Sequence, residues 1–255
     1  MPVEFVLVAG PMVRASSWKP TADRLRAAGC VVQVPDILAQ CAVPPAWSDW
    51  TRHLLDQITP SEELILVGHS SASALVADLA TRLPARAIII FDGDIPPPEG
   101  RAGPVRPALH DFIRSIAASD GTLPVWSRWF SRHPDRAAII GLDHLALDPV
   151  ALAEFEIGLP RMTIGWFNDV IHLAPWHHVP AGYVQTSPIY DHASAEARRR
   201  AWPVVRLRGT HLHPTLNPTE SANAILSLGR ELEVASSGSG IKAASRKTDP
   251  DRDRR

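Results

Sequence analysis

The sequence predicts an α/β fold, a mostly parallel sheet flanked by helices on both faces. Short apolar runs typical of buried strands alternate with segments whose apolar residues recur at helical spacing. Such alternation is characteristic of parallel sheets built by right-handed crossovers. The alternation stops near residue 95 and resumes near residue 180, so we expect one sheet interrupted by an insertion.

Turn residues divide both alternating stretches into strands and helices. In the first stretch, strands are expected at 5–9, 31–34, 64–67 and 87–91, and helices at 16–28, 47–58 and 71–83. In the second, strands are expected at 182–185 and 204–207, and helices at 193–200 and 218–228. Residues 1–95 and 180–232 are therefore expected to form one core.

Residues 96–179 interrupt this core. Prolines and glycines crowd the first part of the segment and exclude regular structure there. The remainder holds helical pieces rich in tryptophan and phenylalanine, with no convincing strand, so we expect a helical cap with aromatics mostly in its own core. Residues 233–255 are dominated by Ser, Gly, Lys, Asp and Arg, which predicts a disordered C-terminal tail.

Ser70 lies where an apolar strand turns sharply into a helix of small residues. The run Gly68-His69-Ser70-Ser71-Ala72 fits the nucleophile elbow G-x-S-x-G, with alanine in place of the last glycine. In such an elbow, small flanking residues let the strand and helix backbones approach while the serine hydroxyl is held out at the top of the sheet. The competing interpretation is a serine that caps the following helix.

A serine becomes a strong nucleophile only when a base can take its proton. Gly209-Thr210-His211 directly follows the last expected strand. Because the carboxyl ends of parallel strands meet at one edge of the sheet, we expect His211 near Ser70 as the general base. His213 is the rival candidate, and His211 is favoured because it lies closer to the strand end.

The histidine needs an acid that fixes its tautomer, and this acid is expected between the serine and the histidine in chain order. Asp191 follows the strand at 182–185 and precedes His211, so it is the preferred acid. Asp92 and Asp94 follow the strand at 87–91 and are the alternative. A turn-forming role is the competing interpretation for all three aspartates.

These features resemble the α/β-hydrolase superfamily, specifically its small members that are similar to plant-type esterases and hydroxynitrile lyases. The resemblance spans about residues 3–230, and the insertion stands where that superfamily carries its cap. Besides the elbow and the terminal histidine, the matching residues are Phe5-Val6-Leu7-Val8-Ala9-Gly10, Trp18, Ala27-Ala28-Gly29 and Val34-Pro35-Asp36. The resemblance implies that Ser70, Asp191 and His211 form a catalytic triad and that Ser71 supplies one oxyanion amide.

One departure from the superfamily concerns the oxyanion site. Its members usually draw the second donor from the backbone amide just after the glycine that ends the first strand, and that position is Pro11 here. Proline has no N–H, and the loss of one such donor typically lowers turnover by about 100- to 1000-fold. Either Met12 provides the amide through a shifted loop, or the protein does not stabilise a tetrahedral oxyanion in the usual way.

Composition argues against several classes of function. The formal net charge of -1 gives no field that would attract nucleic acid or an anionic membrane. Cys30 and Cys41 form neither a disulfide framework nor a metal site, which favours a reducing compartment. Because the chain shows no signal peptide and no apolar run near 18 residues, we expect a cytoplasmic protein.

Neither a cofactor nor a metal is expected. The chain contains no phosphate-cradling glycine motif. His172, His177 and His178 lie close together in sequence, but Pro175 interrupts their segment, so they do not share the helical spacing of metal ligands. The expected partner is a small-molecule substrate, and the oligomeric state stays open, with a homodimer as one option.

The leading hypothesis is a serine hydrolase of the esterase or lactonase type that acts on a small or medium apolar ester, amide or lactone. Ser70 attacks, His211 transfers the proton and Asp191 orients His211, while the Ser71 amide and a loop amide hold the oxyanion. The alternative is a lyase or isomerase in which His211 acts as base without an acyl-enzyme, an idea that Pro11 motivates. A third hypothesis is a ligand-binding protein with a largely inactive triad.

Overall fold

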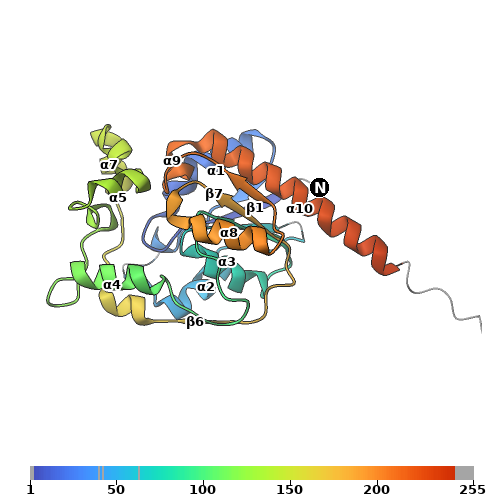
Figure 1. The fold of residues 1–255 in the computed structure, drawn as a ribbon, viewed down its shortest axis with the longest axis horizontal. Helices are drawn as coiled ribbons and strands as arrows, with labels where there is room; N and C mark the ends of the chain where they lie inside the picture. Colours follow the sequence, from blue (N-terminus) through green and yellow to red (C-terminus); the bar gives the residue numbers. More distant parts are fainter. Residues whose placement is uncertain (1–2, 40, 42, 63, 245–255) are drawn as a thin grey trace, which may run out of the picture.

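The computed structural model describes residues 3–39, 41, 43–62 and 64–244, with side chains described as far as residue 233. Its centre is a six-stranded parallel sheet in the order β2-β1-β3-β4-β7-β8 (Figure 1). The strands are β1 (Glu4–Val8), β2 (Val31–Gln33), β3 (Leu64–His69), β4 (Ala85–Phe91), β7 (Ala181–Gln185) and β8 (Val204–Arg206). The predicted fold class is confirmed.

Helices bury both faces of the sheet. Because side chains alternate along a strand, Phe5 and Leu7 of β1 join the core that α1 and α10 cover, whereas Val6 and Val8 join the core that α2 and α3 cover. The helices of this part of the chain are α1 (Lys19–Ala27), α2 (Trp47–Leu55), α3 (Ala72–Ala80), α8 (Asp191–Arg199), α9 (His213–Leu216) and α10 (Pro218–Ala244). Burial on both faces explains why the central strands are continuous apolar runs.

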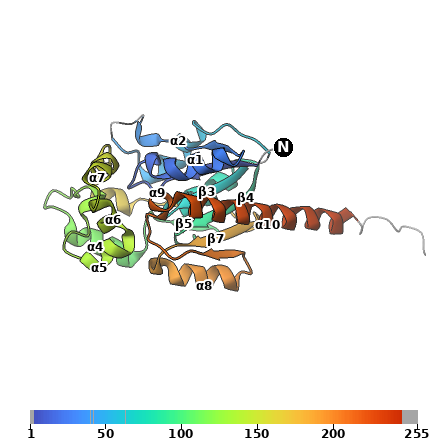
Figure 2. The ribbon, with the colours of Figure 1, turned by 90° about the horizontal axis from the view of Figure 1, so that it is seen from above.

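Residues 96–179, called the insertion below, separate β4 from β7, and their helices gather beyond one end of the sheet (Figures 1 and 2). The elements are β5 (Gly100–Ala102), α4 (Pro107–Ile116), α5 (Pro134–Ile140), α6 (Leu142–Ala146), α7 (Pro149–Glu156) and β6 (Ile171–Leu173). The sequence predicts no regular structure in the Pro- and Gly-rich first part and no convincing strand after it, but both expectations are corrected by β5 and β6, which pair antiparallel. Three residues cannot establish an alternating pattern, and β5 and β6 also lack the paired valines that mark the equally short β2 and β8.

Short 3₁₀ helices complete the described elements. They are η1 (Ala15–Trp18), η2 (Ile37–Ala39), η3 (Trp126–Arg128), η4 (Ile164–Asn168) and η5 (Pro188–Tyr190). Among them, η5 joins β7 to α8 and lies next to the functional site described below.

The last helix is longer than its sequence predicts. We expect it to end at residue 228 and disorder to begin at 233, but α10 continues to Ala244 and projects past the sheet (Figures 1 and 2). An established helix adds further residues at little cost, even where composition favours disorder. Residues 245–255 of the expected tail lie outside the described residues. No helix in the described part of the chain, α10 included, has the length and apolarity needed to cross a membrane.

The order of the strands brings four loops to one edge of the sheet. Ser70 follows β3 and Asp92 follows β4, while Thr186 follows β7 and His211 lies in the loop after β8. These four strands are consecutive neighbours and parallel, so their carboxyl ends point the same way. The fold thereby collects polar residues from distant parts of the sequence at a single edge.

Candidate functional site

Ser70 stands at a sharp turn between β3 and α3. Its φ of 58° lies in the left-handed region, which a non-glycine residue adopts only when the surrounding structure holds it there. A Cβ at Gly68 would lie 2.6 Å from the carbonyl oxygen of Ala72, so the turn requires glycine at that position. The methyl group of Ala72 is fully buried, so the elbow accommodates alanine where the motif usually has glycine.

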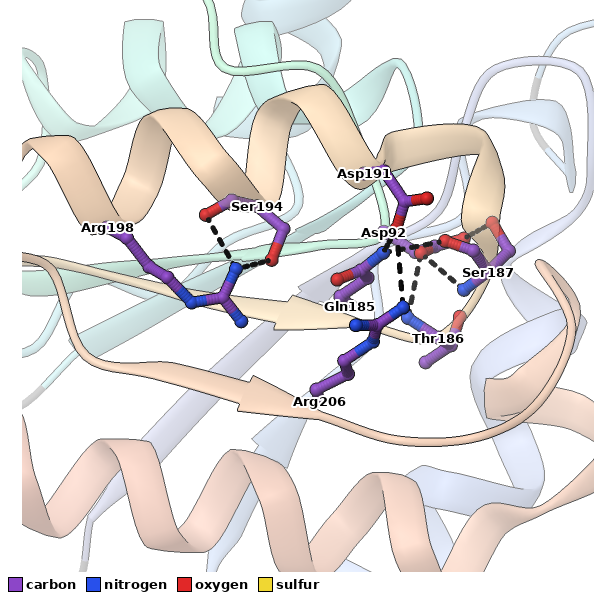
Figure 3. A network of polar contacts seen from close by, with 8 residues as sticks. All are labelled: Asp92, Gln185, Thr186, Ser187, Asp191, Ser194, Arg198 and Arg206. Atoms are coloured by element: carbon purple, nitrogen blue, oxygen red, sulfur yellow. Dashed lines mark hydrogen bonds and ion pairs between the residues drawn. The ribbon is translucent and has the colours of Figure 1, made fainter.

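His211 and Asp92 form a buried pair at the same edge. Nδ1 of His211 donates a hydrogen bond of 2.8 Å to Oδ2 of Asp92. The Asp92 carboxylate also accepts hydrogen bonds from the amides of Thr186 and Ser187, at 2.8 and 2.9 Å, and from the Ser187 hydroxyl at 2.7 Å (Figure 3). Burial opposes ionisation, but the hydrogen bonds from His211, Ser187 and Thr186 outweigh it and hold the pKa of Asp92 below its ordinary value.

Asp191, the preferred acid of the sequence analysis, does not meet His211 in the structure. It is the first residue of α8, its side chain is 61% exposed, and it contacts Gln185 and Arg206 instead (Figure 3). The partner of His211 is therefore corrected to Asp92, which was the alternative. The physical reason is that η5 carries the chain away from the strand end before Asp191, whereas Asp92 follows β4 immediately.

Asp94 and His213, the other candidates from the sequence, do not take part in the pair formed by His211 and Asp92. Oδ1 of Asp94 is 2.6 Å from Nε2 of His192, at a partly exposed position. His213 is buried, and its Nε2 lies 3.3 Å from a carboxylate oxygen of Glu220 on α10. Of the two rival histidines, His211 is thus the one that Asp92 contacts, as its place near the strand end predicts.

His69, the residue before Ser70, supports the loop that carries His211. Its Nε2 donates a hydrogen bond of 2.9 Å to the backbone carbonyl of His211, and the two ring centroids are 4.5 Å apart. Burial, with a smaller effect from His211, lowers the pKa of His69 to about 3. His69 is therefore a neutral donor that holds the His211 loop in place.

The loop after β1 lies directly opposite Ser70. A Cβ built on Gly10 would be 3.5 Å from the Cβ of Ser70, and the Val13 amide closes a turn by bonding the Gly10 carbonyl at 3.0 Å. Pro11 has no N–H, but Met12 lines the cavity that contains Ser70. Within the described residues, the amides of Met12 and Ser71 donate no hydrogen bond to the protein.

Ser70 and His211 open into a cavity of about 310 Å³. Its apolar lining comes largely from side chains of the insertion, among them Leu109, Phe112, Trp126, Phe130, Ile139 and Ile140. A larger cavity, of about 470 Å³, lies between the ends of β7 and β8, but its walls include neither Ser70 nor His211. We call the smaller one the Ser70 cavity.

Tyr190 is a residue of this site that sequence reasoning missed. It lines the Ser70 cavity, its hydroxyl interacts with that of Ser70, and its ring centroid is 5.5 Å from that of His211. Burial, together with the carboxylate of Asp94, raises the pKa of Tyr190, so its phenol stays protonated as a donor. The sequence offers no signal for this role, because an aromatic residue between a strand and a helix is equally consistent with core packing.

Metal ligands do not gather at this edge. Within the described residues, no group of three or more His, Cys, Asp or Glu side chains is placed to hold a metal ion.

Solved structures match the fold over nearly the whole chain. An extracellular α/β-hydrolase from a Paenibacillus species, described as sharing structural and functional homology with tobacco salicylic acid binding protein 2, gives a TM-score of 0.68 at 18% identity and covers 90% of this chain and 100% of its own. A variant of tomato methylketone synthase I gives 0.68 at 15% identity, covering 91% and 99%. A pyrethroid hydrolase from Sphingobium faniae gives 0.64 at 18% identity, covering 90% and 98%.

No protein-family model matches the chain, and neither does any curated protein. The structural matches nevertheless establish the α/β-hydrolase fold that the sequence predicts.

Acid is expected to destabilise the protein through His69. The pKa of this group is about 3 in the folded protein, against 6.5 for an ordinary histidine, so the unfolded chain takes up the proton first. The stability due to neutral His69 is fully present above about pH 6.5 and is lost as the pH falls toward 3. Between about pH 6.5 and about pH 4.5, this group alone should lower the free energy of unfolding by about 2 kcal/mol.

Urea unfolding at the two pH values measures this loss. His69→Gln retains an N–H donor but does not titrate. Between the two pH values, the free energy of unfolding of this variant should therefore fall by about 2 kcal/mol less than that of wild type. An equal loss in both proteins would show that His69 is not held neutral by the fold.

Proposed function

We propose that this chain, which has the α/β-hydrolase fold, is a serine hydrolase of the esterase or lactonase type that acts on a small or medium apolar ester, amide or lactone. The observation that carries the proposal is the meeting of three features at one edge of the sheet. Ser70 is held at a left-handed elbow, His211 lines the same cavity, and Asp92 holds the far nitrogen of His211.

In this proposal each residue has one step. Asp92 engages Nδ1 of His211, which leaves Nε2 as the nitrogen that takes the proton when Oγ of Ser70 attacks the carbonyl carbon. The ionised Asp92 stabilises the imidazolium that forms. His211 then returns the proton to the leaving group, and a water molecule activated by the same imidazole hydrolyses the acyl-enzyme.

Stabilisation of the oxyanion is assigned to the amides of Ser71 and Met12. Pro11 removes the amide usually found in this loop, and the turn from Gly10 to Val13 carries Met12 to the cavity wall in its place. The Tyr190 hydroxyl, beside Ser70, adds a further donor close to the reacting oxygen. The insertion serves as the cap of the active site, and its aromatic and aliphatic wall favours apolar substrates.

Pro11 favours a second candidate, a lyase or isomerase in which His211 acts as base without an acyl-enzyme. A solved structure with the same fold is tomato methylketone synthase I, described in complexes with 2-tridecanone and with β-ketoheptanoate. That protein illustrates that ligands other than esters occupy this architecture. A ligand-binding protein with a largely inactive triad is the third candidate.

A fluorophosphonate probe separates these candidates. If Ser70 is an activated nucleophile, the probe labels wild type and Ser71→Ala, whose backbone amide is intact, but not Ser70→Ala. Wild type is then expected to hydrolyse 4-nitrophenyl esters of short to medium acyl chains. An unlabelled Ser70 contradicts the hydrolase proposal, and labelling without ester hydrolysis favours the lyase or the binding protein.

The assignment of Asp92 predicts different effects for two aspartates. Asp92→Asn should lower kcat for a 4-nitrophenyl ester by about 10³- to 10⁴-fold, because the amide favours the wrong tautomer of His211. Asp191→Asn is the matched control and should stay within about threefold of wild type, since its side chain is exposed. Circular dichroism checks that both variants fold. A large loss in Asp191→Asn with little change in Asp92→Asn would reverse the assignment.

A further inference from the structure

Charged side chains interrupt the apolar wall of the Ser70 cavity at three places. Asp94, Arg106 and Arg136 line the cavity together with the apolar residues of the insertion. One carboxylate and two guanidinium groups give this lining an excess of one positive charge. An apolar cavity with excess positive charge is suited to a ligand that combines an apolar body with a negative charge.

Arg106 has an acidic neighbour within the protein. Its Nη1 lies 4.0 Å from Oδ1 of Asp94, and its guanidinium lies over the Tyr190 ring at 5.8 Å from the centroid. The same Asp94 oxygen also contacts Nε2 of His192 at 2.6 Å. Arg106 and Asp94 thus form a local network beside Ser70, and this network leaves Arg136 as the source of the excess charge.

Helix α5 places Arg136 in the wall of the Ser70 cavity. It precedes Ile139 and Ile140 by one turn of α5, and residues at this spacing share a helix face. All three line the Ser70 cavity. The carbon at the centre of the Arg136 guanidinium is 5.1 Å from the centroid of Phe112, whose ring stacks on Phe130 at 5.3 Å. This stacking orients the guanidinium along the wall.

Arg136 has no acidic partner among the described residues. Arg136 is an exposed residue of the cavity lining, so its guanidinium, which lies over the Phe112 ring, is open to an acceptor that arrives from solvent. Guanidinium groups of this kind bind carboxylates through two parallel hydrogen bonds.

We propose that Arg136 binds a carboxylate of the substrate, so that the preferred substrate is an apolar ester carrying a second, free carboxylate, such as a half-ester of a medium-chain dicarboxylic acid. This inference rests on the proposed hydrolase function, because it places the ester carbonyl at Ser70. The apolar chain lies along the wall formed by Phe112, Ile139 and Ile140, and the free carboxylate lies at Arg136.

A pair of substrates matched in length tests this inference. One is the mono-4-nitrophenyl ester of octanedioic acid and the other is 4-nitrophenyl octanoate, and the quantity measured is the ratio of their kcat/KM values. Arg136→Gln should lower the ratio of charged to neutral ester by about tenfold, the effect of losing one charged hydrogen-bonding pair. Arg136→Lys, which retains the positive charge, should recover part of the preference.

Arg132→Gln is the control, because Arg132 precedes α5 by two residues and is not part of the cavity wall. Its ratio should equal that of wild type. An unchanged ratio in Arg136→Gln would overturn the inference while both esters are still hydrolysed. An equal fall of the ratio in Arg132→Gln would also overturn it, because the effect would then come from the general charge of the surface.

Binding of octanoate provides a readout that does not depend on catalysis. Trp126 lines the Ser70 cavity, so its fluorescence reports occupancy. Octanoate should bind Ser70→Ala about tenfold more tightly than it binds the double variant Ser70→Ala with Arg136→Gln. Equal affinities would overturn the inference, whereas failure of the fluorophosphonate to label wild type would overturn the proposed function instead.

Discussion

The carboxylate of Asp92 accepts hydrogen bonds from Thr186, Ser187 and His211 in a position with no solvent exposure. A charge buried in this way is tolerated only when its oxygens accept hydrogen bonds, and an unsatisfied buried polar group costs about 1–3 kcal/mol, or more when it is charged. The hydrogen bonds therefore tie the end of β4 to the loops after β7 and β8. The position of His211, and with it the proposed chemistry of Ser70, depends on this carboxylate.

The backbone around the carboxylate is strained and firmly held. Ser70 and Asp92 have φ values of 58° and 45°, each in a region that costs about 1–3 kcal/mol for a non-glycine residue. Both follow adjacent strands, and their amides bond the carbonyls of Phe91 and Val184 on the neighbouring strands, at 3.1 and 2.7 Å. The sheet thus fixes both residues before any substrate arrives, which is the preorganisation that nucleophilic catalysis requires.

Local patterns in the sequence are enough to predict the sheet, the elbow and the histidine. The central strands are apolar runs bounded by turn residues, and Gly68 and Ala72 identify the elbow because only small residues fit beside Ser70. The choice between Asp92 and Asp191 depends instead on tertiary structure. Both follow strands, and only the path of η5 shows that Asp191 turns outward.

Other parts of the site are not encoded in a local pattern at all. Tyr190 and Arg136 line the Ser70 cavity although their segments are distant from Ser70 in sequence. Nothing in the neighbouring residues indicates which way either side chain faces. The sequence alone shows that Pro11 removes the backbone amide usually found in this loop. Only the turn from Gly10 to Val13 indicates that the Met12 amide can replace it.

A crystal structure of the protein after reaction with a phosphonate ester tests the central claim most directly. The account predicts phosphorus bonded to Oγ of Ser70, a phosphoryl oxygen that accepts hydrogen bonds from the amides of Ser71 and Met12, and Nδ1 of His211 still bonded to Asp92. A phosphoryl oxygen turned away from both amides, or a His211 ring that has left Asp92 for another acid, would contradict the account.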